Sequence, residues 1–156
     1  MTLWLTVTAA LASALMGGIF FAFSSFVMPA LGRIPPAEGI RAMQRINIDV
    51  FHWSFVVAFF GTPAACLALA VQALRHWNDA GAPFAIAGSV VYLVGCLLVT
   101  GAGNVPRNNA LAKVDANTVD ARREWERFAR GWVRWNHLRT VACLAAAAAF
   151  VAALVA

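Results

Sequence analysis

Four long stretches of the sequence contain no Asp, Glu, Lys or Arg, and they constrain the fold more than any other feature. They cover residues 1–32, 50–74, 80–106 and 140–156. A helix needs about 20 apolar residues, each rising about 1.5 Å, to cross a bilayer. The first three stretches exceed that length, and the fourth reaches it if its helix begins in the charged segment before it. The sequence therefore predicts an all-α integral membrane four-helix bundle.

Composition excludes two other classes of protein. Hydrophobic residues make up 62% of the chain and charged residues 12%, with a mean hydropathy of +0.72. Soluble proteins carry about 45–50% apolar and about 25% charged residues, and disordered chains are less hydrophobic still. Cys66, Cys96 and Cys143 lie in apolar runs without metal-ligand spacing, so we expect core or lipid-facing thiols. We expect one membrane domain over residues 1–156.

Helical periodicity adds two amphipathic segments to the spans. We expect spans at about 3–28, 51–74, 83–103 and 136–155, and amphipathic segments at about 37–50 and 119–135. The first segment, with Ile40 and Met43 on one face and arginines on another, is typical of a short interfacial helix after the first span. The second segment, capped by Asn117 or Thr118, runs into the fourth span, which predicts a long fourth helix that extends out of the membrane. Gly, Asn and Pro at 101–109 predict a turn after the third span.

The distribution of basic residues predicts the orientation. The connection between the first two spans has three arginines, the connection between the last two has eight basic residues, and the short middle link has only Arg75. The positive-inside rule therefore places both long connections in the cytoplasm and both termini on the outer side. Acidic residues are interleaved with the arginines, so we do not expect nucleic-acid binding. No basic residue precedes the first apolar run, so we expect a retained helix rather than a signal peptide.

Polar side chains gather at the cytoplasmic ends of the spans. Four clusters stand out: Asn47, His52 and Trp53; Asn104, Asn108 and Asn109; Trp132, Trp135, Asn136 and His137; and Arg139 with Thr140. An antiparallel bundle brings these ends to one level. Polar groups near membrane depth cost free energy unless they are paired or line a wet cavity, so the clusters predict a functional site.

Each cluster also has a purely structural interpretation. His52 and His137 can be interfacial histidines that bond a carbonyl, and the asparagines can satisfy helix ends. The tryptophan stripe, which begins at Trp125, is more typical of an aromatic belt at the membrane surface than of a substrate-binding platform. The sequence has no phosphate loop, nucleophile elbow, paired carboxylates or zinc-protease motif, which disfavours the common hydrolases, kinases and nicotinamide enzymes.

Taken together, these residues resemble the anthrone oxygenase family of small four-span membrane proteins. The resemblance extends over nearly the whole chain and rests on residues 18–24, 27–31 and 43–47, on Asn104-Val-Pro-Arg-Asn108, and on Trp125, Trp132, Trp135 and residues 137–140. The Asn-x-Pro-x-Asn motif followed by Trp, Trp, His and Arg-Thr is moderately specific. The apolar parts are not.

The resemblance implies a four-helix membrane bundle and an oxidation of anthrones to anthraquinones by dioxygen, which fungal members carry out without a cofactor. It does not fix the substrate. Asn104 and Asn108 match the loop pair of the family, Trp132 and His137 match its fourth-helix positions, and Arg139 follows them. Arg107 stands where an apolar residue is common, which leaves the shape of the substrate mouth open.

The first hypothesis is a membrane-embedded oxygenase that acts on a hydrophobic aromatic with an acidic C–H bond or a phenol. His137 or His52 would remove the proton, and the amides of Asn104 and Asn108 would stabilise the enolate oxygen. Dioxygen would be the co-substrate, and no metal or other cofactor would be needed. The remaining candidates would bind the substrate: Trp132, Trp135, Trp125, Asn47 and Arg139.

Two alternatives belong to other classes of protein. One is a haem- or metal-binding electron-transfer protein, with His52 and His137 as ligands from facing helices. The other is a non-catalytic membrane module that forms a homo-oligomer or assists a partner through small residues such as Ser13 and Gly17. The expected partners are the lipid bilayer and a hydrophobic small molecule.

Overall fold

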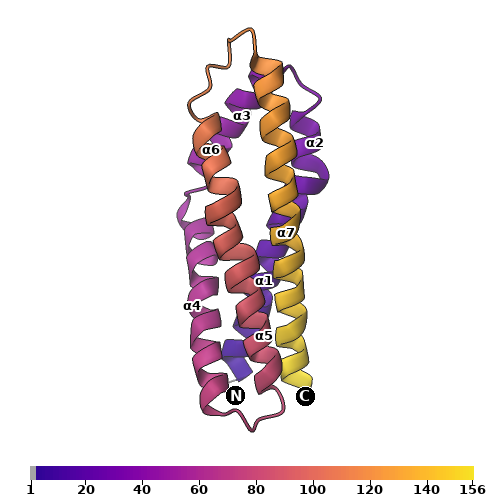
Figure 1. Ribbon diagram of the computed structural model, residues 1–156. Coiled ribbons are helices and arrows are strands. Elements are labelled where there is room, and N and C mark those ends of the chain that lie inside the picture. The colour runs from indigo at the N-terminus through magenta and orange to yellow at the C-terminus, as the bar shows by residue number, and fades with distance from the viewer. Residues whose placement is uncertain (1–2) are drawn as a thin grey trace.

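The computed structural model describes residues 3–156, and every regular element in that range is helical. Four rods run up and down the bundle (Figure 1). In chain order the elements are α1 (Leu3–Ala22), η1 (Phe23–Val27), α2 (Met28–Leu31), α3 (Pro36–Asp49), α4 (Trp53–Arg75), α5 (Ala82–Tyr92), η2 (Leu93–Leu98), η3 (Thr100–Asn104), α6 (Val105–Leu111) and α7 (Ala121–Val155). The three η segments are π-helical turns within otherwise α-helical rods.

Each of the four rods is long and apolar enough to cross a membrane. The rods are Leu3–Leu31, Trp53–Arg75, Ala82–Leu111 and Ala121–Val155. This confirms the predicted all-α four-span bundle with a long fourth helix, and the protein is an integral membrane protein. Both termini and the α4–α5 link lie at one end of the bundle, and α3 and the α6–α7 link lie at the other (Figure 1).

The short helix after the first span begins where the sequence places it. Pro36 occupies the first turn of α3, where its missing N–H costs no hydrogen bond. On the exposed face, Arg45 Nε donates to Asp49 Oδ2 at 2.8 Å. On the inner side, Gln44 Nε2 donates to the carbonyls of Leu111 at 2.9 Å and Val114 at 3.0 Å, which fixes α3 to the end of α6.

The fourth helix begins slightly later than its predicted cap. Its N-cap residue is Asp120, and neither Asn117 nor Thr118 takes that position. Asn117 instead accepts a hydrogen bond from Arg41 of α3, which ties the α6–α7 link to that helix. Farther along α7, Glu126 pairs with Arg130, one turn away, at 3.6 Å.

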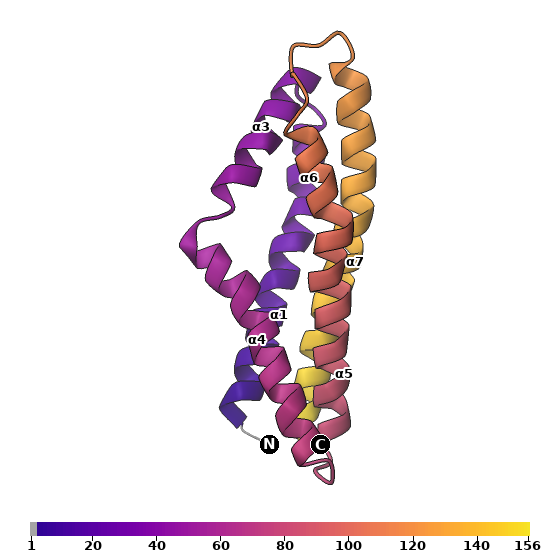
Figure 2. The same ribbon diagram turned by 60° about the vertical axis from the view of Figure 1, so that its left-hand side comes forward.

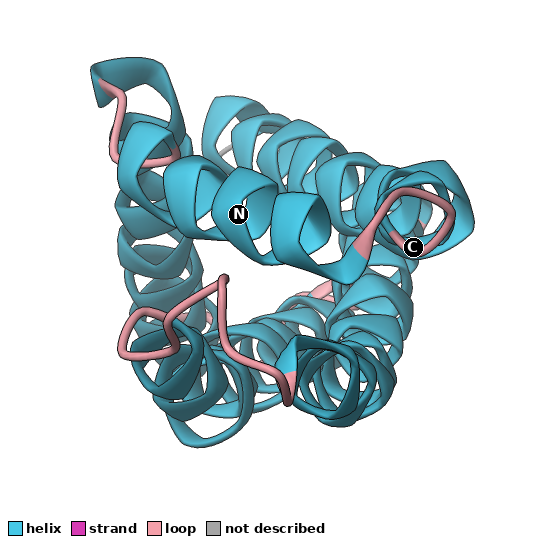
Figure 3. Ribbon diagram, turned by 90° about the horizontal axis from the view of Figure 1, so that it is seen from above, coloured by secondary structure: helices cyan, strands magenta, loops and turns pink. Residues whose placement is uncertain are grey.

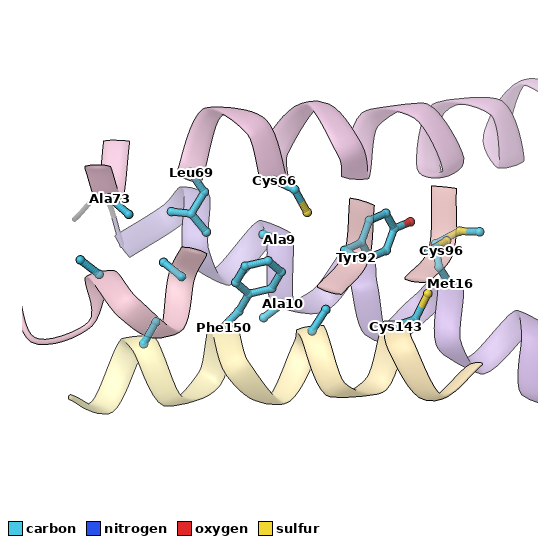
Figure 4. Packing of buried hydrophobic residues seen from close by; sticks show 14 of the residues in the cluster. Ala9, Ala10, Met16, Cys66, Leu69, Ala73, Tyr92, Cys96, Cys143 and Phe150 are labelled. Carbon is cyan, nitrogen blue, oxygen red and sulfur yellow. The ribbon is translucent and has the colours of Figure 1, made fainter. Parts of the chain in front are cut away.

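The core at the terminal end of the bundle depends on small residues that let the rods approach closely. Figure 4 shows Phe150 of α7, Leu69 of α4 and Tyr92 of α5 packed together with the three cysteines. A Cβ on Gly88 would lie 2.7 Å from Phe150 Cε1, so this ring fills the space that the glycine leaves. Cys66, Cys96 and Cys143 are all fully buried, which confirms that they are core thiols.

The third span does not end in the predicted turn at 101–109. Instead, the chain stays helical through η3 and α6 to Leu111. Two features make this possible. Pro106 lies in the first turn of α6, where a missing N–H is tolerated, and Gly103 leaves room for the Trp135 ring, 2.5 Å from where a Cβ would stand. The wider π-helical turn η3, which precedes Pro106, accommodates the loss of the backbone hydrogen bond that proline cannot donate.

Candidate functional site

A cavity of about 680 Å³ lies in the half of the bundle that carries α3. In Figure 2, the end of α3 and the first turns of α4 stand away from α1, and residues of these elements, of α6 and of α7 line the cavity. Figure 3 gives the view along the bundle axis from this end. The polar lining consists of Gln44, Asn47, Thr100, Asn108, Asn109 and Arg139, and the rest of the lining is apolar, including Ile19, Phe20, Phe23, Met43, Phe51, Phe55, Phe59, Phe60 and Trp132.

Two of the π-helical turns border this cavity. Phe23 belongs to η1 and Thr100 to η3, and both residues line it. A π-helical turn inserts an extra residue and so changes the direction of the side chains that follow, and such turns are frequent at functional sites. The two irregular turns thus both contribute to the wall of the cavity.

Arg139 supplies the only full charge among the residues that line the cavity. Its side chain is 5% exposed, and its guanidinium carbon lies 4.0 Å from the centre of the Phe20 ring. Nη1 donates to Thr100 Oγ1 at 3.2 Å, and Nη2 donates to Asn136 Oδ1 at 2.5 Å. Within residues 3–156, Nε has no hydrogen-bond partner and no carboxylate pairs with this arginine.

Both neutral partners of Arg139 are themselves held in place. Asn136 is fully buried, and its Nδ2 donates to the Phe20 carbonyl and to Ser24 Oγ, each at 2.6 Å. The side-chain oxygen Oδ1 of Asn136 therefore faces Arg139. Thr100 donates its own proton to the Cys96 carbonyl at 2.7 Å, which leaves its oxygen as an acceptor. The guanidinium is thus held in one place by neutral groups.

Trp132 presents its ring to the cavity, and two asparagines position it. The indole Nε1 donates to Asn108 Oδ1 at 2.8 Å, and Asn104 Nδ2 donates to the Trp132 carbonyl at 3.2 Å. The ring lies 5.7 Å from the ring of Phe23, measured between centroids. Asn108 lines the cavity, whereas Asn104 is 1% exposed and does not line the cavity.

Asn47 adds a second unpaired donor to the cavity lining. Its Nδ2 is buried and has no hydrogen-bond partner in the part of the chain that the structure describes. A buried donor without a partner costs free energy comparable to a lost hydrogen bond. Asn47 on α3 and Arg139 on α7 thus both line the cavity, and each has an N–H group without a hydrogen-bond partner within residues 3–156.

The structure does not bring His137 to this site. Asn136 faces the core, and the next residue on a helix points about 100° away, so the His137 side chain is exposed on the outer face of α7. His52, also exposed, precedes α4, and its Nδ1 lies 3.0 Å from Ser54 Oγ. Neither imidazole lines the cavity.

Two of the tryptophans that the sequence predicts to bind the substrate, Trp135 and Trp125, do not line the cavity. Trp135 lies against Gly103, and the guanidinium of Arg107 stacks over its ring at 5.6 Å. Trp125 is buried in a second apolar cluster, where it contacts Gly39 of α3 and Phe128. Arg107, which stands where an apolar residue is common in the family, therefore stacks on Trp135 and does not line the cavity.

Sequence reasoning missed several lining residues. Phe51 comes from the α3–α4 link, Phe55, Phe59 and Phe60 come from the first half of α4, and Phe20 and Phe23 come from the first rod. Phenylalanine is ordinary in a membrane span, so composition and spacing do not indicate that these side chains line a cavity. Asn136 was visible in the sequence as part of a cluster, but no role was assigned to it.

A haem held between His52 and His137 does not fit this arrangement. Bis-histidine ligation requires two imidazoles that face one another across an interior space, and these two side chains are exposed outside the cavity. Within residues 3–156, no group of three or more His, Cys, Asp or Glu side chains is placed to hold a metal ion.

Comparison with known proteins gives one match. The family model described as anthrone oxygenase matches residues 50–149, which is more than half of the chain. No curated protein and no solved structure is significantly similar to the chain. The match includes the polar residues from Thr100 to Arg139 that line the cavity or hold its lining in place: Thr100, Asn104, Asn108, Asn109, Asn136 and Arg139. The four-span bundle, its aromatic cavity and this match lead to one conclusion, which is that the chain belongs to the anthrone oxygenase family.

Proposed function

We propose that this protein is a membrane-embedded oxygenase that oxidises a hydrophobic phenolic aromatic, such as an anthrone, with dioxygen. The observation that carries the proposal is the cavity of about 680 Å³, lined by aromatic rings and by the buried guanidinium of Arg139. This volume suits a molecule of about three fused rings, since small-molecule sites span about 300–1,000 Å³. Family membership supports the reaction class.

The proposed reaction needs no redox group on the protein. An anthrone loses one proton from its methylene carbon, which leaves an enolate whose charge is shared with the carbonyl oxygen. The carbon then forms a C–O bond to dioxygen, and the resulting peroxide anion takes up a proton. Loss of the second C–H proton with cleavage of the O–O bond gives the new carbonyl and releases hydroxide, which becomes water. Overall, one CH₂ group and one O₂ become one C=O group and one H₂O.

In this proposal the protein binds the substrate and stabilises its charge. The Arg139 guanidinium faces the oxygen that carries the developing charge, where a fixed donor in a dry site stabilises it more than water does. The Asn47 amide bonds a second oxygen, and Trp132 stacks on the rings with its orientation set by Asn108. His137 has no part in this mechanism because its side chain lies outside the cavity.

The substrate reaches the cavity from the side of the bundle. Ile48, Phe51 and Phe60 line the cavity and are also exposed, at 64%, 72% and 56%. Exposed apolar side chains at a cavity mouth favour access from lipid over access from water. A hydrophobic aromatic dissolved in the membrane would therefore enter between α3 and α4.

We also propose that the end of the bundle carrying α3 faces the cytoplasm. The arginines of the two long connections gather at this end, and the opposite end has only Arg75 in its link. A labelling tag placed after Ala156 would then be accessible to an impermeant reagent in intact cells. Labelling only after the cells are broken would overturn this orientation.

Dioxygen consumption tests the proposed activity. Protein purified in mild detergent is mixed with 1,8-dihydroxyanthrone, and dioxygen uptake is recorded together with anthraquinone formation. The expected result is one dioxygen consumed per anthraquinone formed, at least tenfold faster than with heat-denatured protein, and at the same rate after treatment with a chelator. Uptake no faster than with denatured protein would overturn the proposal, and loss of activity after chelation would overturn its independence of metals.

A further inference from the structure

From the surroundings of Arg139 we infer that the cavity binds its ligand as an aromatic oxyanion, with this guanidinium as the charge-binding group, and that the ligand loses its proton to water. The inference rests on the proposed function only in taking this cavity as the substrate site. The form of the ligand that binds is the ionised one, and a fixed positive charge, rather than an acid–base side chain, favours its ionisation.

Among residues 3–156, Arg139 is a buried cation without a counter-ion. Its contacts are Thr100 Oγ1, Asn136 Oδ1 and the face of Phe20, all of which are neutral, and Nε is unpaired within residues 3–156. Charged side chains inside membrane spans are nearly always paired or part of a functional site. An anion in the adjoining cavity would supply the missing opposite charge.

No acid–base side chain competes for this role. Apart from Arg139, the charged and titratable groups on the helices around the cavity lie outside its lining: Glu38, Arg41, Arg45 and Asp49 of α3, His52 before α4, Cys66 and Arg75 of α4, Tyr92 of α5, Arg107 of α6, and Arg122, Arg123, Glu124, Glu126, Arg127, Arg130, Arg134 and His137 of α7. Asp49 pairs with Arg45 on the outer face of α3. Cys96 and Cys143 lie one helical turn from Thr100 and Arg139, inside the core. The lining thus has a positive charge and no side chain that ordinarily accepts a proton at neutral pH.

The shape and lining of the cavity favour a flat aromatic anion over a fatty acid. The guanidinium lies beside aromatic rings, with the Phe20 ring centre at 4.0 Å and the Trp132 ring centre at 5.4 Å from its central carbon, and both rings line the cavity. A ligand whose oxygen approaches this guanidinium therefore lies close to these rings. Aromatic faces bind one another in offset-stacked or edge-to-face arrangements that an alkyl chain cannot adopt.

The test uses 1,8-dihydroxyanthraquinone, which is already oxidised, so that binding is measured without turnover. Its phenolate absorbs at longer wavelength than its neutral form, so an absorption titration gives the apparent pKa of the bound probe. In the wild-type protein we expect this pKa to lie at least one unit below its value in empty detergent micelles. Such a difference means that the protein favours the ionised probe over the neutral probe at least tenfold more than the micelle does. An equal pKa in protein and in micelles would overturn the inference.

Variants identify the group responsible. R139Q should abolish the lowering of the probe pKa, and R139K, which keeps the charge, should restore part of it. R107Q is the matched control, since it removes an arginine that stacks on Trp135 and does not line the cavity. The control should behave as the wild type. Far-UV circular dichroism checks that each variant is folded, and a folded R139Q protein that still lowers the probe pKa would overturn the inference.

Competition with laurate decides the class of anion. Laurate has the same charge on an alkyl chain, and we expect it to displace the probe at least tenfold less effectively than 9-anthracenecarboxylate does. Equal displacement by both would overturn the assignment to aromatic anions. If the probe pKa is lowered but no dioxygen is consumed with anthrone, then the proposed oxygenase activity fails while the anion site stands.

Discussion

Arg139 Nη2 donates a hydrogen bond of 2.5 Å to Asn136 Oδ1, one turn earlier on α7. The amide is the nearest acceptor that the protein gives to this buried cation, and it is neutral. A carboxylate of the same shape at position 136 would turn the site into an internal ion pair. The absence of charge at Asn136 is therefore what leaves the guanidinium free to attract an anion from the cavity.

This relationship predicts the effect of N136D. The new carboxylate would neutralise Arg139, so we expect the affinity for the ionised anthraquinone probe to fall at least tenfold. The spectroscopic titration described above measures it. N117D is a control with the same change of charge at an exposed position, and it should bind the probe as the wild type does. Wild-type affinity in folded N136D would contradict this role of Asn136.

A second prediction concerns the bond between the Trp132 indole and Asn108. W132F and N108A each remove the same hydrogen bond of 2.8 Å, so their effects should not add. We expect each variant to lower the free energy of unfolding by about 1–2 kcal/mol, and a double-mutant cycle to give a coupling of about 0.5–1.5 kcal/mol. Unfolding in mixed detergent and SDS micelles measures both values. A coupling near zero would show that the bond contributes nothing to stability.

The two exposed histidines provide a third prediction. Because neither His52 nor His137 lines the cavity, H52A and H137A should keep kcat/KM for 1,8-dihydroxyanthrone within about twofold of the wild type. Steady-state dioxygen uptake measures it. General acid–base residues usually contribute about 10²–10⁴-fold to a rate, so a loss of that size in H137A would mean that His137 transfers the proton after all.

Two glycines of the same π-helical turn provide a fourth prediction with a built-in control. A Cβ on Gly103 would lie 2.5 Å from the Trp135 ring, whereas a Cβ on Gly101 meets nothing within 4 Å. G103A should lower the free energy of unfolding by about 1–3 kcal/mol through overpacking. G101A should leave it unchanged or raise it by up to about 1 kcal/mol, since alanine is the better helix former. Equal stabilities of the two variants would contradict the close contact of Gly103 with Trp135.

The spans could be predicted because one physical requirement determines them. A helix in hydrocarbon excludes charge along about 20 residues. Three of the four charge-free stretches are long enough by themselves, and the fourth needs only a few residues before Thr140. The end of the third span could not be predicted in the same way. Glycine, asparagine and Pro106 are typical of a turn, and only packing against Trp135 shows why the helix continues to Leu111.

The candidate site was predictable in part. Arg139, Asn47, Asn108 and Trp132 were singled out as polar or aromatic groups at one level of the bundle, and the structure places all four at one cavity. The direction in which the His137 side chain points depends on the rotation of α7 about its axis. The hydrogen bonds of Asn136 to the first rod fix this rotation. The stripe through Trp125, Phe128 and Trp132 continues to positions 136 and 139, so it already indicated that position 137 lies off the inner face.

Labelled dioxygen tests the central claim most directly. In ¹⁸O₂, 1,8-dihydroxyanthrone is oxidised by wild-type protein, by the R139Q variant and by heat-denatured protein, and the anthraquinone is analysed by mass spectrometry. We predict one ¹⁸O atom in the new carbonyl, formed at least tenfold faster by the wild type than by R139Q or by denatured protein. Unlabelled product, or equal rates in all three samples, would contradict the account that this cavity uses Arg139 to oxidise a phenolic aromatic.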